Sequence, residues 1–195
     1  RGDSVIATCR NVASAKDLQS VAEKSEGRLK IVEMDVATPE GNSRLASALQ
    51  SESVDVLINN AGHYSKDGGP FESIDFDGIM TDFAINAMGS LRVAQAALPA
   101  IRRGAGKKII NISSVQGDQA RPSIAPYTAT KGAVNNLTKG MATDWARHGI
   151  QVNAIGPGYF ITEITQPLAD NPDFDSWLRG RTPAGRWGDP AELVG

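Results

Sequence analysis

Two short apolar runs, Lys108–Ile112 (KIINI) and Gln151–Ile155 (QVNAI), decide the fold of this chain. Each has the length and the β-branched content typical of a buried strand. The residues between them predict a helix from about Pro126 to Arg147, ended by a His148-Gly149 C-cap. Two strands joined through a helix form a crossover connection, so they are expected to lie parallel in one sheet.

The same alternation of strand and helix extends toward the N-terminus. The expected strands are Ser4–Cys9, Leu29–Met34 and Val54–Ile58, and the expected helices are Ala13–Ser25, one opening near Pro39-Glu40, and a long stretch from about Asp75 to Arg102. Repeated crossovers give a mostly parallel sheet with helices on both faces. The sequence therefore predicts a doubly wound α/β fold, organised as a single domain over residues 1–195.

Composition and charge narrow the function classes. The chain has 195 residues, of which 41% are hydrophobic and 22% charged, as in ordinary globular domains. A formal charge of −2 leaves no basic excess for a nucleic-acid backbone. The longest apolar runs are too short to cross a bilayer, and the N-terminus does not resemble a secretory signal. We therefore expect neither a nucleic acid nor a membrane as partner.

Cysteine and histidine are scarce. Cys9 is the single cysteine and cannot form an internal disulfide, which favours a reducing, cytoplasmic location. The two histidines, His63 and His148, cannot assemble a His/Cys metal site. No metal is expected.

Small or polar residues follow the end of every expected strand. They are Arg10-Asn11, Asp35, Asn59-Asn60-Ala61-Gly62, Ser113-Ser114 and Gly156-Pro157-Gly158. In doubly wound sheets, ligands bind outside the carboxyl ends of the strands. Most candidate functional residues should therefore lie along one edge of the sheet.

Tyr127 and Lys131 are the pair best suited to acid–base chemistry. They stand four positions apart on a predicted helix, so their side chains share one face. A phenol with a solution pKa of about 10 becomes a better proton donor and acceptor at neutral pH beside an ammonium group. The alternative is a chance spacing between two ordinary surface residues.

Ser114 and Asn86 are candidates with plausible structural alternatives. Ser114 directly follows a strand, where its hydroxyl could bind a substrate oxygen or cap a turn; Ser113 is expected to be structural. Asn86 stands inside a helical stretch, where an Asn is either exposed or holds a kink or a water. Asn60, Ala61 and Gly62 could admit a flat ligand or form a plain turn, and Asp35 could bind an adenine amine or cap the next segment.

Together these elements resemble the short-chain dehydrogenase/reductase family, over nearly the whole chain. The matching elements are Asp35-Val36, Asn59-Asn60-Ala61-Gly62, Asn86, Asn111-Ile112-Ser113-Ser114, Tyr127-Thr128-Ala129-Thr130-Lys131, and Pro157-Gly158 with Thr162. The resemblance implies a Rossmann-like fold and an oxidoreductase that transfers a hydride between a nicotinamide cofactor and a carbonyl or secondary alcohol.

The resemblance also implies roles for individual residues. Tyr127 would be the catalytic acid/base, Ser114 would position the substrate oxygen, Lys131 would lower the pKa of Tyr127 and hold the nicotinamide ribose, and Asn86 would keep a water in the proton relay. The residues expected to line the cofactor are Asn60, Ala61 and Gly62, with Asp35 and Val36 at the adenine and Pro157, Gly158 and Thr162 at the nicotinamide end.

Arg10 bears on the choice of cofactor. Family members that use NAD(H) carry an acidic residue at the strand end where this chain has Thr8-Cys9 followed by Arg10. A guanidinium suits a 2′-phosphate, which favours NADP(H), with NAD(H) as the alternative. The other explanation is a solvated Arg at a strand end.

Two subfamilies are recognisable in the chain. Residues up to about Arg103 resemble the small carbonyl reductases related to C-factor, notably in Val5–Asn11. From about Ser114 onward the chain resembles gluconate 5-dehydrogenase, most closely in Ala125–Asp144 and Thr182–Gly188. This second resemblance implies a sugar acid or polyol as substrate.

Compared with the family pattern, the first strand, the Gly-rich turn and the first helix are not found, and the last strand is also absent. The domain is thus expected to be truncated at both ends, with Ser4–Cys9 and Val54–Ile58 paired directly or covered by a second copy in a homo-oligomer. Two functions stay open: an NADP(H)-dependent oxidoreductase, or a catalytically inactive family member that acts as a self-associating or partner-binding module.

Overall fold

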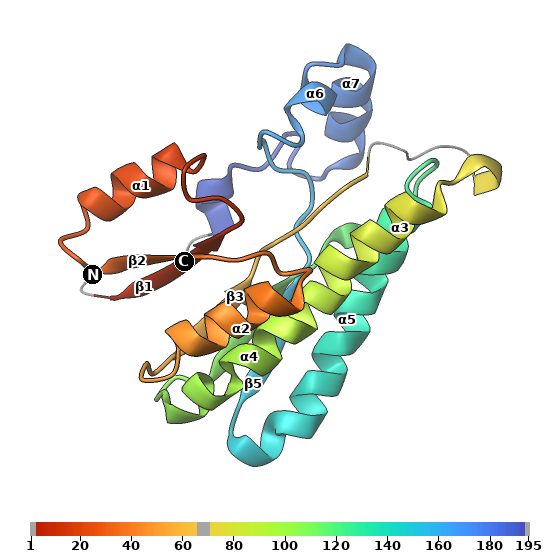
Figure 1. Ribbon diagram of the computed structural model, residues 1–195. Coiled ribbons are helices and arrows are strands. Elements are labelled where there is room, and N and C mark those ends of the chain that lie inside the picture. The colour runs from red at the N-terminus through yellow and green to blue at the C-terminus, as the bar shows by residue number, and fades with distance from the viewer. Residues whose placement is uncertain (1–2, 66–70, 194–195) are drawn as a thin grey trace. The chain divides into compact units, whose positions relative to one another are not determined.

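The computed structural model describes residues 3–65 and 71–193 (Figure 1). The chain divides into two compact units, Arg1–Ile155 and Gly156–Gly195. Among the described residues, no helix is both long enough and apolar enough to cross a membrane.

The first unit alternates strands with helices, as the sequence predicts. Its strands are β1 (Val5–Cys9), β2 (Leu29–Glu33), β3 (Val56–Asn59), β4 (Lys108–Ile112) and β5 (Gln151–Ile155). Its α-helices are α1 (Lys16–Glu23), α2 (Pro39–Ala48), α3 (Phe76–Asp82), α4 (Ser90–Arg103) and α5 (Ala125–Trp145). Short 3₁₀ turns lie at Phe71–Ser73 (η1), Val115–Gly117 (η3) and Ala146–His148 (η4). Every strand pair is parallel, which confirms the predicted α/β class.

Local signals account for the helix boundaries. Thr38 caps α2 by accepting a hydrogen bond from the amide of Gly41, with Pro39 in the first turn where its missing N–H costs nothing. Beyond α5 the chain turns at Gly149, whose φ of 71° is the left-handed conformation of a C-cap. Both ends agree with the sequence prediction.

Of the two arrangements expected for Ser4–Cys9 and Val54–Ile58, direct pairing of the two strands is wrong. The strands form two sheets, β1-β2 and β3-β4-β5, and within the described residues β1 and β3 do not pair with each other. The hydrophobic core explains how the unit holds together without that pairing. Met34, just after β2, is 2% exposed and joins Leu45 on α2, Leu49 directly after α2 and Ala94 on α4 in one cluster. The β1-β2 pair is therefore attached through helix packing and not through a strand ladder.

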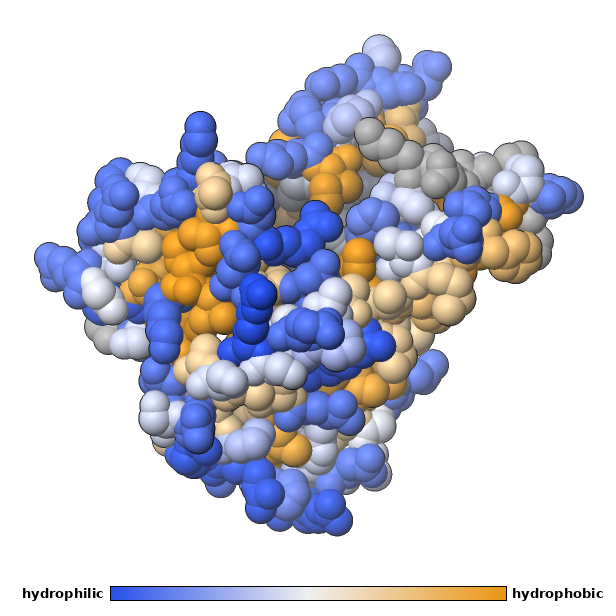
Figure 2. All heavy atoms as spheres, in the orientation of Figure 1, coloured by the Kyte–Doolittle hydropathy of each residue, from blue (hydrophilic) through white to orange (hydrophobic). Residues whose placement is uncertain are grey.

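The edges of β1 and β3 carry exposed apolar side chains. Val5 on β1 is 51% exposed, and on β3 Val56 and Ile58 are 46% and 58% exposed. Figure 2 shows apolar surface gathered over the part of the molecule that holds β1 and β2. An exposed strand edge with apolar side chains is a template for pairing with another strand.

The second unit has its own small core. It contains α6 (Gln166–Ala169), α7 (Pro172–Arg181) and the 3₁₀ turn η5 (Pro190–Leu193). The rings of Tyr159, Phe174 and Trp187 pack edge-on or tilted, with centroids 5.7 to 6.2 Å apart. The indole N–H of Trp187 donates to Asp175 over 2.7 Å, which satisfies the polar end of a buried ring.

Candidate active site

The ends of β3 and β4 lie side by side. Their parallel register pairs Asn59 with Asn111, so the residues that follow each strand emerge at the same edge of the sheet. Asn60, Ala61 and Gly62 are exposed there. A Cβ built on Gly62 would meet nothing nearer than 3.9 Å, so this backbone is open to close approach by a ligand.

A buried amide network fixes these strand ends. Asn59 Nδ2 donates to Asn111 Oδ1 over 2.8 Å and to the carbonyl of Ser90 over 3.1 Å. Asn111 Nδ2 in turn donates to the hydroxyl of Thr138 on α5 over 2.9 Å. Buried amides are retained when they are fully paired, and this network ties β3, β4, α4 and α5 together beneath the site.

Helix α5 presents Tyr127 and Lys131 together, as predicted. Lys131 Nζ lies 5.7 Å from the centroid of the Tyr127 ring. It donates to the carbonyl of Ile112, the last residue of β4, over 2.9 Å. Lys131 is only 5% exposed, and this burial lowers its pKa to about 8. At neutral pH the site therefore holds an ammonium group against a phenol ring.

Ser113 and Ser114 follow β4 and serve different structural purposes. The hydroxyl of Ser113 donates to Asn135 over 2.6 Å, which confirms its structural role. Ser114 Oγ accepts from the amide of Gln116 over 3.1 Å and so caps the turn Val115–Gly117. A hydroxyl that accepts in one bond still carries a hydrogen to donate, so capping leaves Ser114 able to bind a substrate oxygen.

The kink that Asn86 suggested is present. Residues Phe83–Gly89 form a π-helical segment (η2) between α3 and α4, and Asn86 is 1% exposed within it. Its amide accepts from the backbone N–H of His63 over 2.7 Å and donates to the carbonyl of His63 over 2.9 Å and to Thr130 over 3.0 Å. Asn86 thus joins α5 to the loop that follows Gly62; the predicted water relay stays a prediction.

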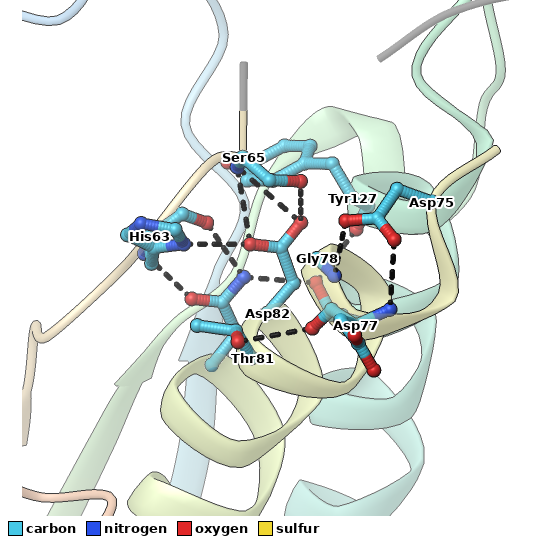
Figure 3. Close-up of polar contacts among 10 residues, drawn as sticks. His63, Ser65, Asp75, Asp77, Gly78, Thr81, Asp82 and Tyr127 are labelled. Atoms are coloured by element: carbon cyan, nitrogen blue, oxygen red, sulfur yellow. Dashed lines mark hydrogen bonds and ion pairs between the residues drawn. The ribbon is translucent and has the colours of Figure 1, made fainter. Parts of the chain in front are cut away.

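Asp82 and His63 are the site residues that sequence reasoning missed. Asp82 is 1% exposed, and its carboxylate accepts from His63 Nδ1 over 2.7 Å and from the hydroxyl of Ser65 over 3.0 Å (Figure 3). A signal was available, because Asp82 lies one helical turn before Asn86 on the same stretch. His63 likewise follows Gly62 directly.

The residues expected at the adenine end lie after β1 and β2. Arg10 follows β1 and is exposed. Asp35 Oδ1 accepts from the amide of Ala37 over 2.8 Å, so the capping alternative is present in the structure. Val36 packs against Gly89, where a Cβ would come within 2.9 Å of the Val36 side chain. Contact of Asp35 and Val36 with adenine stays a prediction.

Pro157, Gly158 and Thr162 belong to the second unit. The amide of Thr162 donates to the hydroxyl of Thr165 over 2.9 Å, and the two threonine hydroxyls are 3.0 Å apart. These bonds shape the segment that leads into α6. Their expected place at a nicotinamide stays a prediction.

Comparison with known proteins identifies the chain's relatives. The profile of the family described as "Enoyl-(Acyl carrier protein) reductase" matches residues 1–195. The gluconate 5-dehydrogenase of Gluconobacter oxydans is 46% identical over 200 residues, covering 100% of this chain and 76% of that enzyme. The 5-keto-D-gluconate 5-reductase of Escherichia coli is 47% identical over 143 residues, which are 73% of this chain and 55% of that enzyme.

Structural comparison gives the same relatives. The crystal structure of a gluconate 5-dehydrogenase from Burkholderia cenocepacia, in complex with NADP and tartrate, superposes with a TM-score of 0.87. It is 40% identical in sequence and covers 98% of this chain and 75% of its own. The gluconate 5-dehydrogenase resemblance is thus confirmed, and it extends through the first half as well; the C-factor resemblance stays a prediction.

The whole-chain family match, the identity to these relatives and the superposition agree, and this chain belongs to the short-chain dehydrogenase/reductase family of oxidoreductases.

Proposed function

We propose that this chain transfers a hydride between NADP(H) and the carbonyl or secondary alcohol of a sugar acid, with Tyr127 as the proton donor and acceptor. The observation that carries the proposal is the buried ammonium of Lys131, 5.7 Å from the Tyr127 ring and fixed to the end of β4. A cation held at that distance stabilises the phenolate more than the phenol.

Each side chain of the site would have a separate role in the reduction of a carbonyl. When bound, NADP(H) supplies the hydride to the carbonyl carbon. The hydroxyl of Tyr127 gives its proton to the oxygen as negative charge develops there, and in the oxidative direction the phenolate takes that proton back. Ser114 donates a hydrogen bond to the same oxygen. Lys131 stabilises the phenolate that the proton transfer leaves behind.

The residues present fit a nicotinamide dinucleotide. Lys131 has three N–H donors, and Ile112 is the acceptor that the described residues show for it, so donors remain for a ribose hydroxyl. Asn60, Ala61 and Gly62 give an open, small-residue surface for a flat ring. Exposed Arg10 would bind the 2′-phosphate, which favours NADP(H) over NAD(H).

The substrate class rests on the relatives. Two of them are named for gluconate or its 5-keto form, and the NADP-bound structure also holds tartrate, a hydroxy acid. We therefore propose a polyhydroxy carboxylic acid that is oxidised or reduced at one carbon.

The test is a titration of NADPH and NADH into the purified chain, followed by turnover of 5-keto-D-gluconate with the better cofactor. Tighter binding of NADPH together with turnover supports the proposal. Binding of neither cofactor, or binding without turnover of any sugar-acid ketone, contradicts it.

The exposed edges of β1 and β3 favour a second candidate function, self-association. Val5, Val56 and Ile58 are about half exposed on strands whose outer edges the described residues leave unpaired. Pairing of these edges between copies would bury them and give a homo-oligomer. Light scattering after size exclusion tests this candidate; a monomer at all concentrations rules it out.

A further inference from the structure

One buried carboxylate holds the loop His63–Ser65 in place. Asp82 on α3 is 1% exposed and accepts three hydrogen bonds from this loop. The donors are His63 Nδ1 at 2.7 Å, the amide of Ser65 at 3.1 Å and the hydroxyl of Ser65 at 3.0 Å. A buried carboxylate is tolerated only when such donors satisfy it, so the loop and Asp82 hold each other in one arrangement.

The imidazole of His63 is fixed in the same way. His63 Nδ1 lies 2.7 Å from Asp82 Oδ1, and this contact orients the imidazole ring. The backbone of His63 is clamped separately, because Asn86 bonds both its N–H and its carbonyl. Figure 3 shows His63 and Ser65 converging on Asp82, with Tyr127 beside them. Two polar anchors thus flank the residue between His63 and Ser65.

That residue is Tyr64, and it packs on Tyr127. The two rings meet edge to face, with centroids 5.7 Å apart and planes at 82°. Tyr64 is still 38% exposed, so part of its ring stays available to a ligand that contacts Tyr127. The main chain of Tyr127 is linked to the same network, since the Thr130 hydroxyl donates to the carbonyl of Tyr127 and accepts from the amide of Asn86.

We propose that Tyr64 determines substrate specificity as a wall of the Tyr127 site, and that Asp82 and His63 are positioning residues that hold it there. The proposal rests on the proposed role of Tyr127. The Tyr64 ring, beside the proposed acid/base, would pack against the C–H groups of a polyhydroxy acid. The alternative is a buried pair that only stabilises the fold.

The kinetic test uses the full chain with NADPH and 5-keto-D-gluconate. Tyr64→Ala and Asp82→Asn are each expected to raise KM for the ketone about ten-fold and to change kcat by less than about three-fold. The Kd of NADPH should stay within about two-fold. A purely structural pair would lower the folded fraction and leave KM alone.

Conservative and matched variants sharpen this test. His63→Asn keeps an N–H donor near the position of Nδ1, so its KM should stay within about three-fold of the wild-type value. His63→Leu lacks this donor and should raise KM as much as Asp82→Asn does. The double variant His63→Leu with Asp82→Asn should be no worse than Asp82→Asn alone, because that single change already weakens the contact between the two side chains. Asp77→Asn makes the same charge change at an exposed position of α3 and should have no effect.

A second readout does not depend on turnover. The chain has 3 tyrosines, so the ring resonances of Tyr64 and Tyr127 can be assigned in labelled protein by Tyr→Phe substitution. Asp82→Asn should move the Tyr127 ring resonances in the same direction as Tyr64→Leu, and 5-keto-D-gluconate should shift those of Tyr64. The proposal is overturned if Asp82→Asn leaves the Tyr127 resonances in place, or if the ketone shifts no Tyr64 resonance. Absence of turnover with both shifts present would instead contradict the proposed function alone.

Discussion

Lys131 Nζ donates a 2.9 Å hydrogen bond to the main-chain carbonyl of Ile112, joining the middle of the site to the last residue of β4. The same ammonium group lies 5.7 Å from the centroid of the Tyr127 ring, so the phenol stands near the end of β4. The ammonium reaches this position by losing most of its contact with water, and that loss has a measurable consequence for stability.

The buried ammonium should make stability depend on pH. The pKa of Lys131 falls from its ordinary value of 10.5 to about 8 because burial disfavours the charged form. Between these values the unfolded chain binds more protons than the folded chain, so stability should rise with pH from about 8 to 10.5. The full difference corresponds to about 3 kcal/mol.

Lys131→Met tests this linkage. At pH 7 the variant should be more stable than the wild type by about 2 kcal/mol, since it loses the desolvation cost but also the bond to Ile112. The advantage should fall to zero near pH ~9.5 and become a deficit of about 1 kcal/mol at pH 10.5, as measured by urea unfolding of both proteins across that range. An advantage that is constant with pH would mean that Lys131 keeps an ordinary pKa.

Removal of the phenol hydroxyl should stop the chemistry and leave binding intact. Tyr127→Phe keeps the ring that packs on Tyr64 but has no proton to give, so kcat should fall by about 10² to 10⁴. The Kd of NADPH and the melting temperature should stay close to the wild-type values. Steady-state kinetics together with a fluorescence titration measure both. A variant that retains wild-type kcat would assign the proton transfer to another group.

Arg10 should bind the 2′-phosphate of NADP(H). Arg10→Ala is expected to weaken NADPH binding about ten- to a hundred-fold, because a charge-assisted hydrogen bond to phosphate is lost, and to leave NADH binding unchanged. Arg44 offers a matched control: it is a largely exposed guanidinium on α2, 3.7 Å from Glu33. Arg44→Ala should leave both titrations unchanged. Equal weakening of NADPH and NADH by Arg10→Ala would contradict phosphate recognition.

The buried network of Asn59, Asn111 and Thr138 should make a large contribution to the free energy of unfolding. Asn111→Leu has a similar volume but removes the donor to the Thr138 hydroxyl and one acceptor of Asn59 Nδ2, so the free energy of unfolding should fall by about 2 to 4 kcal/mol. Asn136 on the same helix α5 is exposed, and Asn136→Leu should change stability by less than about 0.5 kcal/mol. Urea unfolding compares the two. Equal effects would mean that the network contributes nothing beyond ordinary packing.

Local sequence determined the elements that carry the chemistry. The runs Lys108–Ile112 and Gln151–Ile155 are strands with the predicted bounds, and α5 places Tyr127 and Lys131 on one face. Such features depend on side-chain periodicity and on capping residues within a few positions, and the sequence displays both. The kink at Asn86 belongs to the same class, because an Asn inside a helix signals a local irregularity.

Contacts between distant residues were decided only by the tertiary structure. Nothing local to Val5–Cys9 or Val56–Asn59 shows that these strands belong to separate sheets, because a strand's apolar pattern does not name its partner. Asp82 likewise has the sequence signature of an exposed helical acid, yet it is buried and bonded to His63 and Ser65 of a distant loop. Which polar groups pair across the fold depends on three-dimensional packing, and the local sequence pattern does not predict it.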